Sequence, residues 1–321
     1  MEQNEALEAL LNHDFSRIQW PEFDKADATR NTNGKILNAI AKAIPAFIGG
    51  SADLSPSNKT YLNDMGVFPK GKNIYFGIRE HAMAAIANAM ALYGPIMPFT
   101  STFFVFSDYL KPAARIAALT GIQQFFVWTH DSIGVGEDGP THQPIEHLSQ
   151  FRALPNFYVW RPADGRENVE AWKKALTMEK SPSAFVCSRQ TLALLPDAVS
   201  GEASRGAYLL ASDDDAEITL MASGSEVELA LKTKELLNKE GKKVDVVSVP
   251  CFDLFIEQDK DYIDSIIKPT SKKVAIEAAR GLEWYRLADE VIGMDTFGAS
   301  APAGQLFEKF GFTAEQVAAK I

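Results

Sequence analysis

Short apolar runs of strand length alternate with helix-like segments along nearly the whole chain, and this alternation constrains the possible folds more than any other feature. Parallel strands need a helical crossover between them, whereas antiparallel strands can be joined by tight turns. The alternation therefore predicts an α/β fold built of mostly parallel, doubly wound sheets. The expected strands are residues 47–53, 74–76, 96–100, 124–129, 157–161, 183–188, 218–222, 244–249, 273–277 and 291–294.

A polar, turn-rich stretch at 190–215 divides this pattern into two parts, and 321 residues are enough for two domains of ordinary size. Glu226, three residues after Ser223, predicts a capping box at a helix start in the second part. No compact set of acid, base and nucleophile occurs there, so we expect that part to be structural or to form a dimer contact. The expected organisation is a peripheral helix and linker at 1–27, a first domain at 28–195, a linker at 196–212 and a smaller α/β domain at 213–321.

Composition argues against several classes of protein. The formal net charge is −10 and the pI is near 5.1, with no basic run, so we expect no nucleic-acid partner. No apolar run reaches the roughly 18 to 20 residues needed to cross a bilayer, and the N-terminus lacks the features of a signal peptide. Cys187 and Cys251 lie in apolar runs without metal-site spacing. We therefore expect no membrane association, a cytoplasmic location and reduced, buried cysteines.

Glu80 stands where a short apolar strand turns into a helix rich in alanine and methionine, within residues 73–93. A carboxylate at the start of a buried helix is favoured in its charged form by the helix dipole and in its neutral form by desolvation. The simpler interpretation is an ordinary ion pair between Arg79 and Glu80 at a helix start.

Aromatic side chains recur every three residues after the strand at 96–100. We expect a helix over 101–119, in which Phe103, Phe106 and Tyr109 lie near one face. Such a stripe is usually part of a core. At a strand end it could also form the wall of a site for a flat heteroaromatic ring.

A glycine-rich loop at 129–144 holds His130, Asp138 and His142 directly after a strand. The spacing of the two histidines matches no known zinc signature, and the loop lacks the ending of a phosphate-binding loop. We expect it to contact hydroxyl groups and to bind no metal. Arg189, just beyond another strand end, is either a phosphate ligand or a surface arginine.

Long motifs distributed along residues 28–316 together resemble transketolase. These motifs are GGSADLSPSN, FGIREHAM, TFFVFSDYL, THDSIGVGEDGPTHQP, CSRQ and FGASAPAGQLFEKFGF. The resemblance implies a thiamine-diphosphate-binding pyrimidine domain followed by the transketolase C-terminal domain. It also implies transfer of a two-carbon ketol unit between ketose and aldose phosphates of the pentose phosphate pathway, such as xylulose 5-phosphate, ribose 5-phosphate, sedoheptulose 7-phosphate and glyceraldehyde 3-phosphate.

The resemblance implies roles for individual residues in this sequence. Glu80 would hydrogen-bond the aminopyrimidine ring of the coenzyme and help to activate it, and Asp53 would lie near the coenzyme. Phe103, Phe106 and Tyr109 would surround the pyrimidine.

The implied substrate contacts lie on other segments. The sugar hydroxyls would be bound by His130, Asp138 and His142, with His142 also a proton-transfer partner, and the sugar phosphate by Arg30, Ser57 and Arg189.

One motif of the family is absent from this sequence. Transketolases hold the diphosphate and a divalent cation, Mg²⁺ or Ca²⁺, with a GDG motif in a separate domain, and no GDG occurs here. We therefore expect no metal ligand on this chain, which would supply half an active site. The other half would come from a diphosphate-binding partner of a split enzyme or from a longer polypeptide of which this is a fragment, and we expect a dimer. The alternatives are a subunit of a related thiamine enzyme, such as deoxyxylulose-phosphate synthase or the β-type subunit of a 2-oxo-acid dehydrogenase, or a non-catalytic partner.

Overall fold

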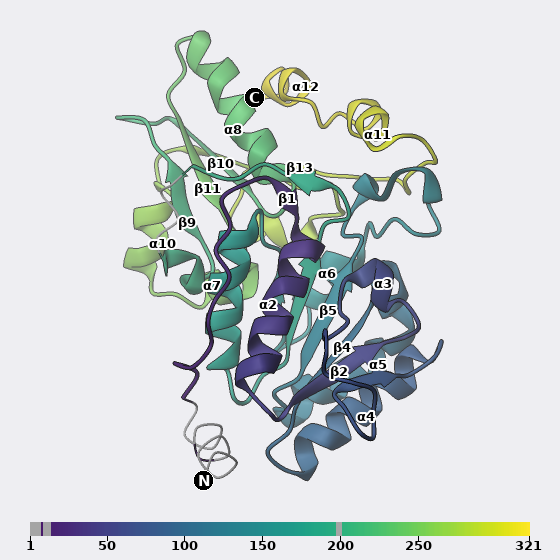
Figure 1. The fold of residues 1–321 in the computed structure, drawn as a ribbon. Coiled ribbons are helices and arrows are strands. Elements are labelled where there is room, and N and C mark those ends of the chain that lie inside the picture. The colour runs from purple at the N-terminus through teal and green to yellow at the C-terminus, as the bar shows by residue number, and fades with distance from the viewer. Residues whose placement is uncertain (1–7, 9–13, 197–200) are drawn as a thin grey trace.

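Two sheets, each covered by helices, organise the computed structural model (Figure 1). It describes residue 8 and residues 14–196 and 201–321. The peripheral helix expected at the start of residues 1–27 falls largely outside this described part of the chain.

The first sheet has six strands, all parallel, in the order β3-β2-β4-β5-β7-β6. The strands are β2 (Phe47–Ser51), β3 (Asn73–Tyr75), β4 (Met97–Phe103), β5 (Phe125–Thr129), β6 (Tyr158–Trp160) and β7 (Ser183–Cys187). The helices are α2 (Thr29–Ala43), α3 (Ser55–Asn58), α4 (Glu80–Tyr93), α5 (Ser107–Thr120), α6 (His147–Arg152) and α7 (Gly165–Leu176). Helices α2 and α7 share one hydrophobic cluster with the sheet, and α4, α5 and α6 share another (Figure 1). The sheet is thus covered on both faces, which confirms the doubly wound arrangement.

Backbone packing around β2 depends on two glycines. A Cβ atom at Gly49 would lie 2.0 Å from the carbonyl oxygen of Phe99, and one at Gly50 would lie 1.8 Å from that of Ile74. Neither position has room for a side chain. The glycines therefore allow β2 to pair closely with β4 and β3.

The second sheet has five strands in the order β13-β12-β10-β11-β9, of which β9 is antiparallel. The strands are β9 (Tyr208–Ala211), β10 (Ile218–Ala222), β11 (Val244–Ser248), β12 (Lys272–Ile276) and β13 (Glu290–Ile292). The helices are α8 (Glu226–Lys239), α9 (Phe252–Ile256), α10 (Lys260–Ile266), α11 (Ala303–Lys309) and α12 (Ala314–Ala318). Hydrophobic clusters pack on both faces of this sheet as well. A short ribbon of β1 (Asp27–Ala28) and β8 (Thr191–Leu192) ties together the two ends of the first domain.

Two expectations about secondary structure are wrong. The helix expected over 101–119 begins only at Ser107, because β4 continues to Phe103 and a 3₁₀ turn, Phe104–Phe106, precedes α5. The segment up to 103 is rich in Thr and Phe, and every residue of β4 is buried in the sheet, where such residues pack well. The expected linker 196–212 contains β9, which is the edge strand of the second sheet and pairs with β11.

Glu226 is not a capping-box residue either. Its buried carboxylate accepts a 2.5 Å hydrogen bond from Nη1 of Arg161, which follows β6 in the first domain. The hydroxyl of Ser223 donates to Glu277 instead. A tertiary ion pair between the domains has replaced the local interaction.

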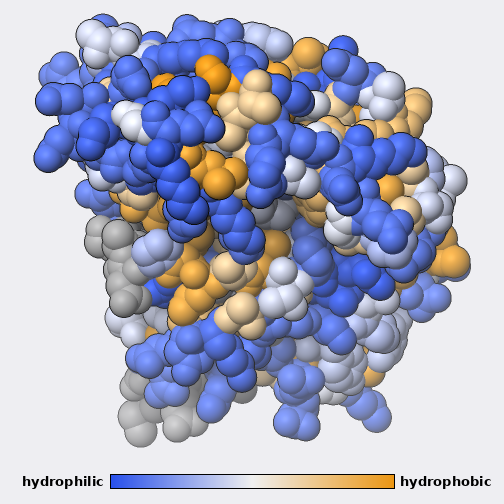
Figure 2. Space-filling view, turned by 90° about the horizontal axis from the view of Figure 1, so that it is seen from above, coloured by the Kyte–Doolittle hydropathy of each residue, from blue (hydrophilic) through white to orange (hydrophobic). Residues whose placement is uncertain are grey.

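The surface is mainly polar, with hydrophobic side chains gathered in smaller patches on the face seen in Figure 2, where α8, α11 and α12 lie. Large exposed apolar side chains also occur along β3, α4 and α5, namely Tyr75, Ile78, Ile86, Leu92, Tyr93, Tyr109, Ile116 and Leu119. Cys187 and Cys251 are free and buried, as predicted. Among the described residues, none of the helices combines the length and apolarity that crossing a bilayer requires.

Candidate active site

The carboxyl ends of the parallel strands bring the predicted site residues to one edge of the first sheet. Asp53 follows β2, Phe103 ends β4, His130 follows β5 and Arg189 follows β7. Glu80 begins α4, after β3. Open parallel sheets place ligands at this edge, because the loops that follow the strands gather there.

Glu80 is 7% exposed at the first residue of α4. The hydroxyl of Thr102 donates to its Oε1 over a long 3.5 Å. Arg79 does not form the simple ion pair considered from the sequence, because its Nη1 donates to the carbonyl oxygen of Phe76 at 3.0 Å. Glu80 is therefore a buried carboxyl group with one weak hydrogen bond among the described residues, available to a ligand group that can donate to it.

Phe103, Phe106 and Tyr109 form a row of rings although they come from a strand, a 3₁₀ turn and a helix. The rings of Phe103 and Phe106 stack with centroids 5.7 Å apart, and those of Phe106 and Tyr109 are 6.2 Å apart. Phe103 is buried, Phe106 half-buried and Tyr109 exposed. The row therefore leads from the interior to the surface and presents an aromatic wall at the sheet edge.

His130 is buried and has a φ of +67°, a left-handed conformation that is uncommon for a residue other than glycine. Its Nδ1 lies 2.8 Å from Oγ1 of Thr129, and that hydroxyl donates to Oδ1 of Asn58, also at 2.8 Å. Burial first, and then the nearby charges of Arg30 and Arg189, lower the pKa of His130 to about 3. The imidazole is therefore neutral near pH 7.

His142 is brought close to His130 by the aromatic row. The ring centroid of Phe103 lies 3.7 Å from that of His130 and 6.3 Å from that of His142. Phe106 contacts His142 at 5.4 Å, edge to face. The two histidines thus face one aromatic surface, with His142 half-buried and more accessible than His130.

Arg30, Ser57 and Arg189 converge beside His130. Nη1 of Arg30 donates to the carbonyl oxygen of Ser57 at 2.9 Å, and its Nε is buried without a hydrogen-bond partner. Burial, followed by the charge of Arg189, lowers the pKa of Arg30. Neither guanidinium forms an ion pair with a carboxylate of the described chain. Two neighbouring cations with free donors form an environment suited to an anion.

Asp53 and Asp138 are less integrated into this cluster. Both side chains are exposed, and neither makes a hydrogen bond or ion pair with another described residue. Asp53 has a φ of +62° directly after β2, as His130 has after β5. Strained backbone at two strand ends of one sheet edge is typical of a functional site.

Sequence reasoning did not identify the groups that hold these side chains. Thr129 and Asn58 orient the ring of His130, and buried Asp131 pairs with Arg161. One signal was available: Arg161 follows a buried apolar strand and precedes Pro162 and Ala163, where an arginine needs a buried acidic partner.

A different group of potential metal ligands contains none of the predicted site residues. Asp108, Glu146 and His147 place three ligand atoms within 4.8 Å of one another, with Nε2 of His147 3.3 Å from Oδ2 of Asp108. The group includes neither His130 nor His142.

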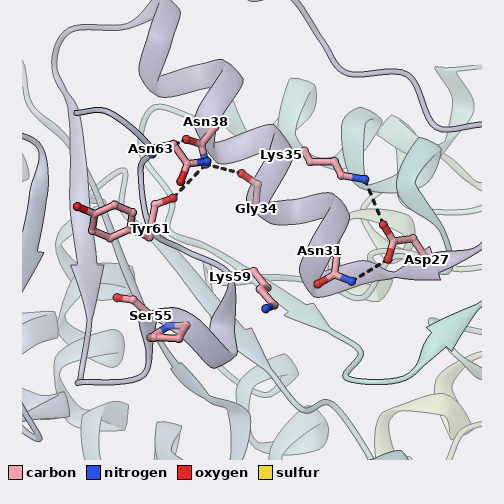
Figure 3. A pocket seen from close by; sticks show the side chains of 10 residues that line it. Asp27, Asn31, Gly34, Lys35, Asn38, Ser55, Lys59, Tyr61 and Asn63 are labelled. Atoms are coloured by element: carbon pink, nitrogen blue, oxygen red, sulfur yellow. Dashed lines mark hydrogen bonds and ion pairs between the residues drawn. The ribbon is translucent and has the colours of Figure 1, made fainter. Parts of the chain in front are cut away.

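A pocket of about 760 Å³ lies between α2 and the α3 loop and contains none of the predicted site residues (Figure 3). Several of its polar side chains are engaged by other residues that line it. Nδ2 of Asn31 donates to Asp27 at 2.7 Å, Lys35 reaches the same carboxylate at 3.2 Å, and Nδ2 of Asn38 donates to the carbonyl oxygens of Gly34 and Tyr61 (Figure 3). Size alone therefore does not locate the functional site.

Family models match both domains. Residues 25–193 match the transketolase pyrimidine-binding domain and residues 206–313 match the transketolase-like C-terminal domain. A transketolase of Staphylococcus aureus (strain MRSA252) is 47% identical over 308 residues, which are 92% of this chain and 46% of the relative. The chain thus spans about half the length of the curated relatives it matches.

Solved structures give the same result. Transketolase from Campylobacter jejuni superposes with a TM-score of 0.95 at 55% identity, covering 99% of this chain and 50% of that one. A Pichia stipitis transketolase in complex with sedoheptulose 7-phosphate has a TM-score of 0.96 at 38% identity, with 99% and 50% coverage. A split-gene transketolase described as an inactive β4 tetramer has a TM-score of 0.73 at 25% identity, and here the coverage is 91% of this chain and 96% of that one.

Proposed function

This chain belongs to the transketolase family, and we propose that it supplies the pyrimidine-binding half of a thiamine-diphosphate-dependent transketolase active site. The reaction is transfer of a two-carbon ketol unit between ketose and aldose phosphates. Thiamine diphosphate, when bound, supplies the carbanion chemistry of that transfer. The chain's own residues would bind and orient the coenzyme and the substrate and would exchange protons with them. The observation that carries the proposal is the convergence, at one sheet edge, of a buried carboxyl, an aromatic row and two arginines that form no ion pair with a carboxylate of the described residues.

The coenzyme contacts are proposed from the fit of the residues. Glu80 has unused acceptor capacity in a buried position, as a carboxyl that binds the aminopyrimidine ring requires. Phe103, Phe106 and Tyr109 offer ring faces and edges for a flat heterocycle, and Asp53 lies at the neighbouring strand end.

The substrate contacts follow from hydrogen bonding and charge. We propose that His130, His142 and Asp138 bind ketose hydroxyls and that His142, the more accessible imidazole, also moves a proton. Arg30 and Arg189, with Ser57, would bind the sugar phosphate. A sugar phosphate is the ligand of the Pichia stipitis relative, which supports this substrate class.

The partner is proposed from the share of its full-length relatives that this chain covers. Because the chain matches only about half of its full-length relatives, the diphosphate-binding half and its Mg²⁺ or Ca²⁺ ligands would come from another polypeptide or another part of a longer one. The split-gene structure shows that a relative of similar length exists as a separate subunit. The exposed apolar side chains of α4 and α5 offer a surface for that half or for a second copy of this chain.

The alternatives are a related thiamine enzyme subunit or a non-catalytic partner. The 55% identity to a transketolase favours the first proposal over deoxyxylulose-phosphate synthase or a 2-oxo-acid dehydrogenase subunit. The presence of both Glu80 and the aromatic row argues against a non-catalytic partner, since such a subunit would have no use for them.

Reconstitution tests the proposal. Turnover of xylulose 5-phosphate with ribose 5-phosphate, thiamine diphosphate and Mg²⁺ is measured for the chain alone and for the chain mixed with a diphosphate-binding transketolase half. We expect turnover only in the mixture, and a loss of about a hundredfold or more with Glu80→Gln. Glu315→Gln, at the first turn of α12, is the matched control. Turnover by the chain alone, or near-normal turnover of Glu80→Gln, would contradict the proposal.

A further inference from the structure

Arg161 connects the two domains through a buried guanidinium. Its Nε and Nη2 donate to Oδ2 of Asp131 at 3.1 and 2.8 Å. Its Nη1 donates to Oε2 of Glu226 at 2.5 Å and to the carbonyl oxygen of Ser223 at 2.8 Å. Arg161, Asp131 and Glu226 are each 2% exposed or less. One cation therefore joins a first-domain carboxylate to a second-domain carboxylate in the interior.

Residues of the second domain hold both the backbone and the side chain of this arginine. The backbone N–H of Arg161 donates to the carbonyl oxygen of Pro250 at 2.7 Å, and its carbonyl oxygen accepts from the N–H of Gly224 at 3.0 Å. Gly224 has a φ of +54°, and a Cβ there would lie 2.8 Å from both Cγ and Nε of Arg161. Both the backbone and the side chain of Arg161 are thus placed by residues 223–226 and 250.

The carboxylate held by Arg161 belongs to the residue directly after His130. Asp131 and the strained backbone of His130 together start the loop that carries the proposed sugar contacts. The far end of this loop is also held by the second domain. Nε2 of Gln143 donates to the carbonyl oxygens of Gly136 and Ala299, both at 2.9 Å.

We propose that Arg161 is a positioning residue, through which the C-terminal domain holds Asp131 and thereby fixes His130 in the orientation that binds the ketose. The inference rests on the proposed function, since the ketose is the ligand assigned to His130. It gives the C-terminal domain a role in the site, although the substrate contacts proposed above all lie on the first domain.

The chain offers a matched control for a purely structural role. Arg152 is a second fully buried arginine at the same interface, bonded to Glu277 at 2.8 and 3.0 Å and to Glu283. Its carboxylate partners, Glu277 and Glu283, lie outside the loop at 129–144. Arg152→Lys therefore perturbs the same interface, and it is linked to the loop indirectly, through Ser223 and Glu277, which both lie near Arg161.

The first measurement uses the whole chain alone, so that it does not depend on activity. Hydrogen–deuterium exchange of the backbone amides at 129–139 is compared among Arg161→Lys, Asp131→Asn and Arg152→Lys, with the melting temperature of each. We expect exchange in this segment to become about tenfold or more faster in the first two variants and to change much less in Arg152→Lys at a similar loss of melting temperature. If Arg161→Lys does not fold, Asp131→Asn decides the comparison.

The second measurement separates the inference from the proposed function. In the reconstituted complex, Asp131→Asn should raise KM for the ketose about tenfold while KM for thiamine diphosphate stays unchanged. If no complex of wild-type halves turns over, the proposed function fails, and the exchange data still test whether Arg161 holds the loop. Equal acceleration of exchange by Arg152→Lys, or an unchanged ketose KM in Asp131→Asn, would overturn the inference.

Discussion

The hydroxyl group of Thr129 lies 2.8 Å from Nδ1 of His130 and donates its single proton to Oδ1 of Asn58. With that proton committed, the hydroxyl can only accept from His130, so the imidazole carries its proton on Nδ1. Its Nε2 is left as a hydrogen-bond acceptor. A neutral, oriented acceptor of this kind suits a sugar hydroxyl.

Thr129→Val should release the ring of His130, because valine keeps the shape of threonine but removes the hydroxyl group. Loss of the buried hydrogen bond to His130 costs about 1–3 kcal/mol, so ketose kcat/KM in the reconstituted complex should fall roughly tenfold to a hundredfold. Nitrogen NMR of the His130 ring, recorded on the Thr129→Val chain alone, should show a mixture of the Nδ1-protonated and Nε2-protonated tautomers. Thr219→Val removes the hydroxyl of another buried threonine, which bonds Ser271 at 2.7 Å, and should change neither result. An unaltered tautomer in Thr129→Val would contradict the orientation argument.

Arg189→Gln should weaken binding of phosphorylated sugars selectively, because it removes one of the two neighbouring guanidinium groups, those of Arg30 and Arg189, that form no ion pair with a carboxylate of the described chain. A charge-assisted hydrogen bond contributes about 1.5–3 kcal/mol, so KM for a ketose phosphate should rise roughly tenfold to a hundredfold. KM for a ketose without the phosphate should stay the same. Arg280→Gln, which removes an arginine paired with Asp295, is the control. Equal effects on both ketoses would show that Arg189 does not contact the phosphate.

Glu167 should make stability depend on pH. Burial, and then the charge of Asp164, raise its pKa from 4.5 to about 7, while Tyr208 and Ser248 of the second domain donate to its carboxyl group. The folded chain therefore binds more protons than the unfolded chain between pH 4.5 and 7. This contribution to stability is complete below pH 4.5 and is lost as pH rises through 7, by about 3 kcal/mol.

The comparison is made between wild type and Glu167→Gln by urea unfolding from pH 5 to 8. His130, with a pKa lowered to about 3, acts in the opposite direction below pH 6.5, so the difference between the two proteins isolates Glu167. The free energy of unfolding of Glu167→Gln, relative to that of wild type, should increase as pH rises. A difference that does not vary with pH would contradict the assignment.

Gly50→Ala should destabilise the first sheet, because the new Cβ would lie 1.8 Å from the carbonyl oxygen of Ile74. Strands β2 and β3 would have to separate, at a cost of about 3 kcal/mol or more in the free energy of unfolding. Gly94→Ala provides the control, since no heavy atom lies within 4 Å of its Cβ position and its φ of 171° is open to any residue. Urea midpoints that fall equally for both variants would contradict the packing argument.

Secondary structure was predictable where burial and local pattern agree. The strand Ile218–Ala222 lies within the residues expected, because an apolar run of β-favouring residues is bounded by polar turns. The strand Tyr208–Ala211 was missed, since four residues at a sheet edge carry too little periodicity to distinguish them from a linker. Phe103 was expected in a helix because aromatic spacing fits a helical face, yet the central sheet buried that segment as a strand.

The candidate site was predicted more completely than its supports. Glu80, His130 and Arg189 were predictable because each is a chemically distinctive residue soon after an expected strand end, and His142 because it shares a glycine-rich loop with His130. Arg161 and Glu226 were not, because their pairing joins residues 65 positions apart in different domains. The local sequence predicted a capping role for Glu226, but its carboxylate instead forms a buried ion pair with Arg161, which is the stronger interaction.

The sequence by itself determined the strand and helix alternation, the family and the identity of the groups at the sheet edge. These depend on short-range patterns of apolar, small and ionisable residues, which are readable along the chain. Tertiary structure alone decided which polar groups are paired and which are free. It set the proton of His130 through Thr129 and Asn58, and it left Arg30 and Arg189 without a carboxylate partner in the part of the chain that the structure describes. Pairing depends on distances of about 3 Å between residues remote in sequence, which only the packed chain defines.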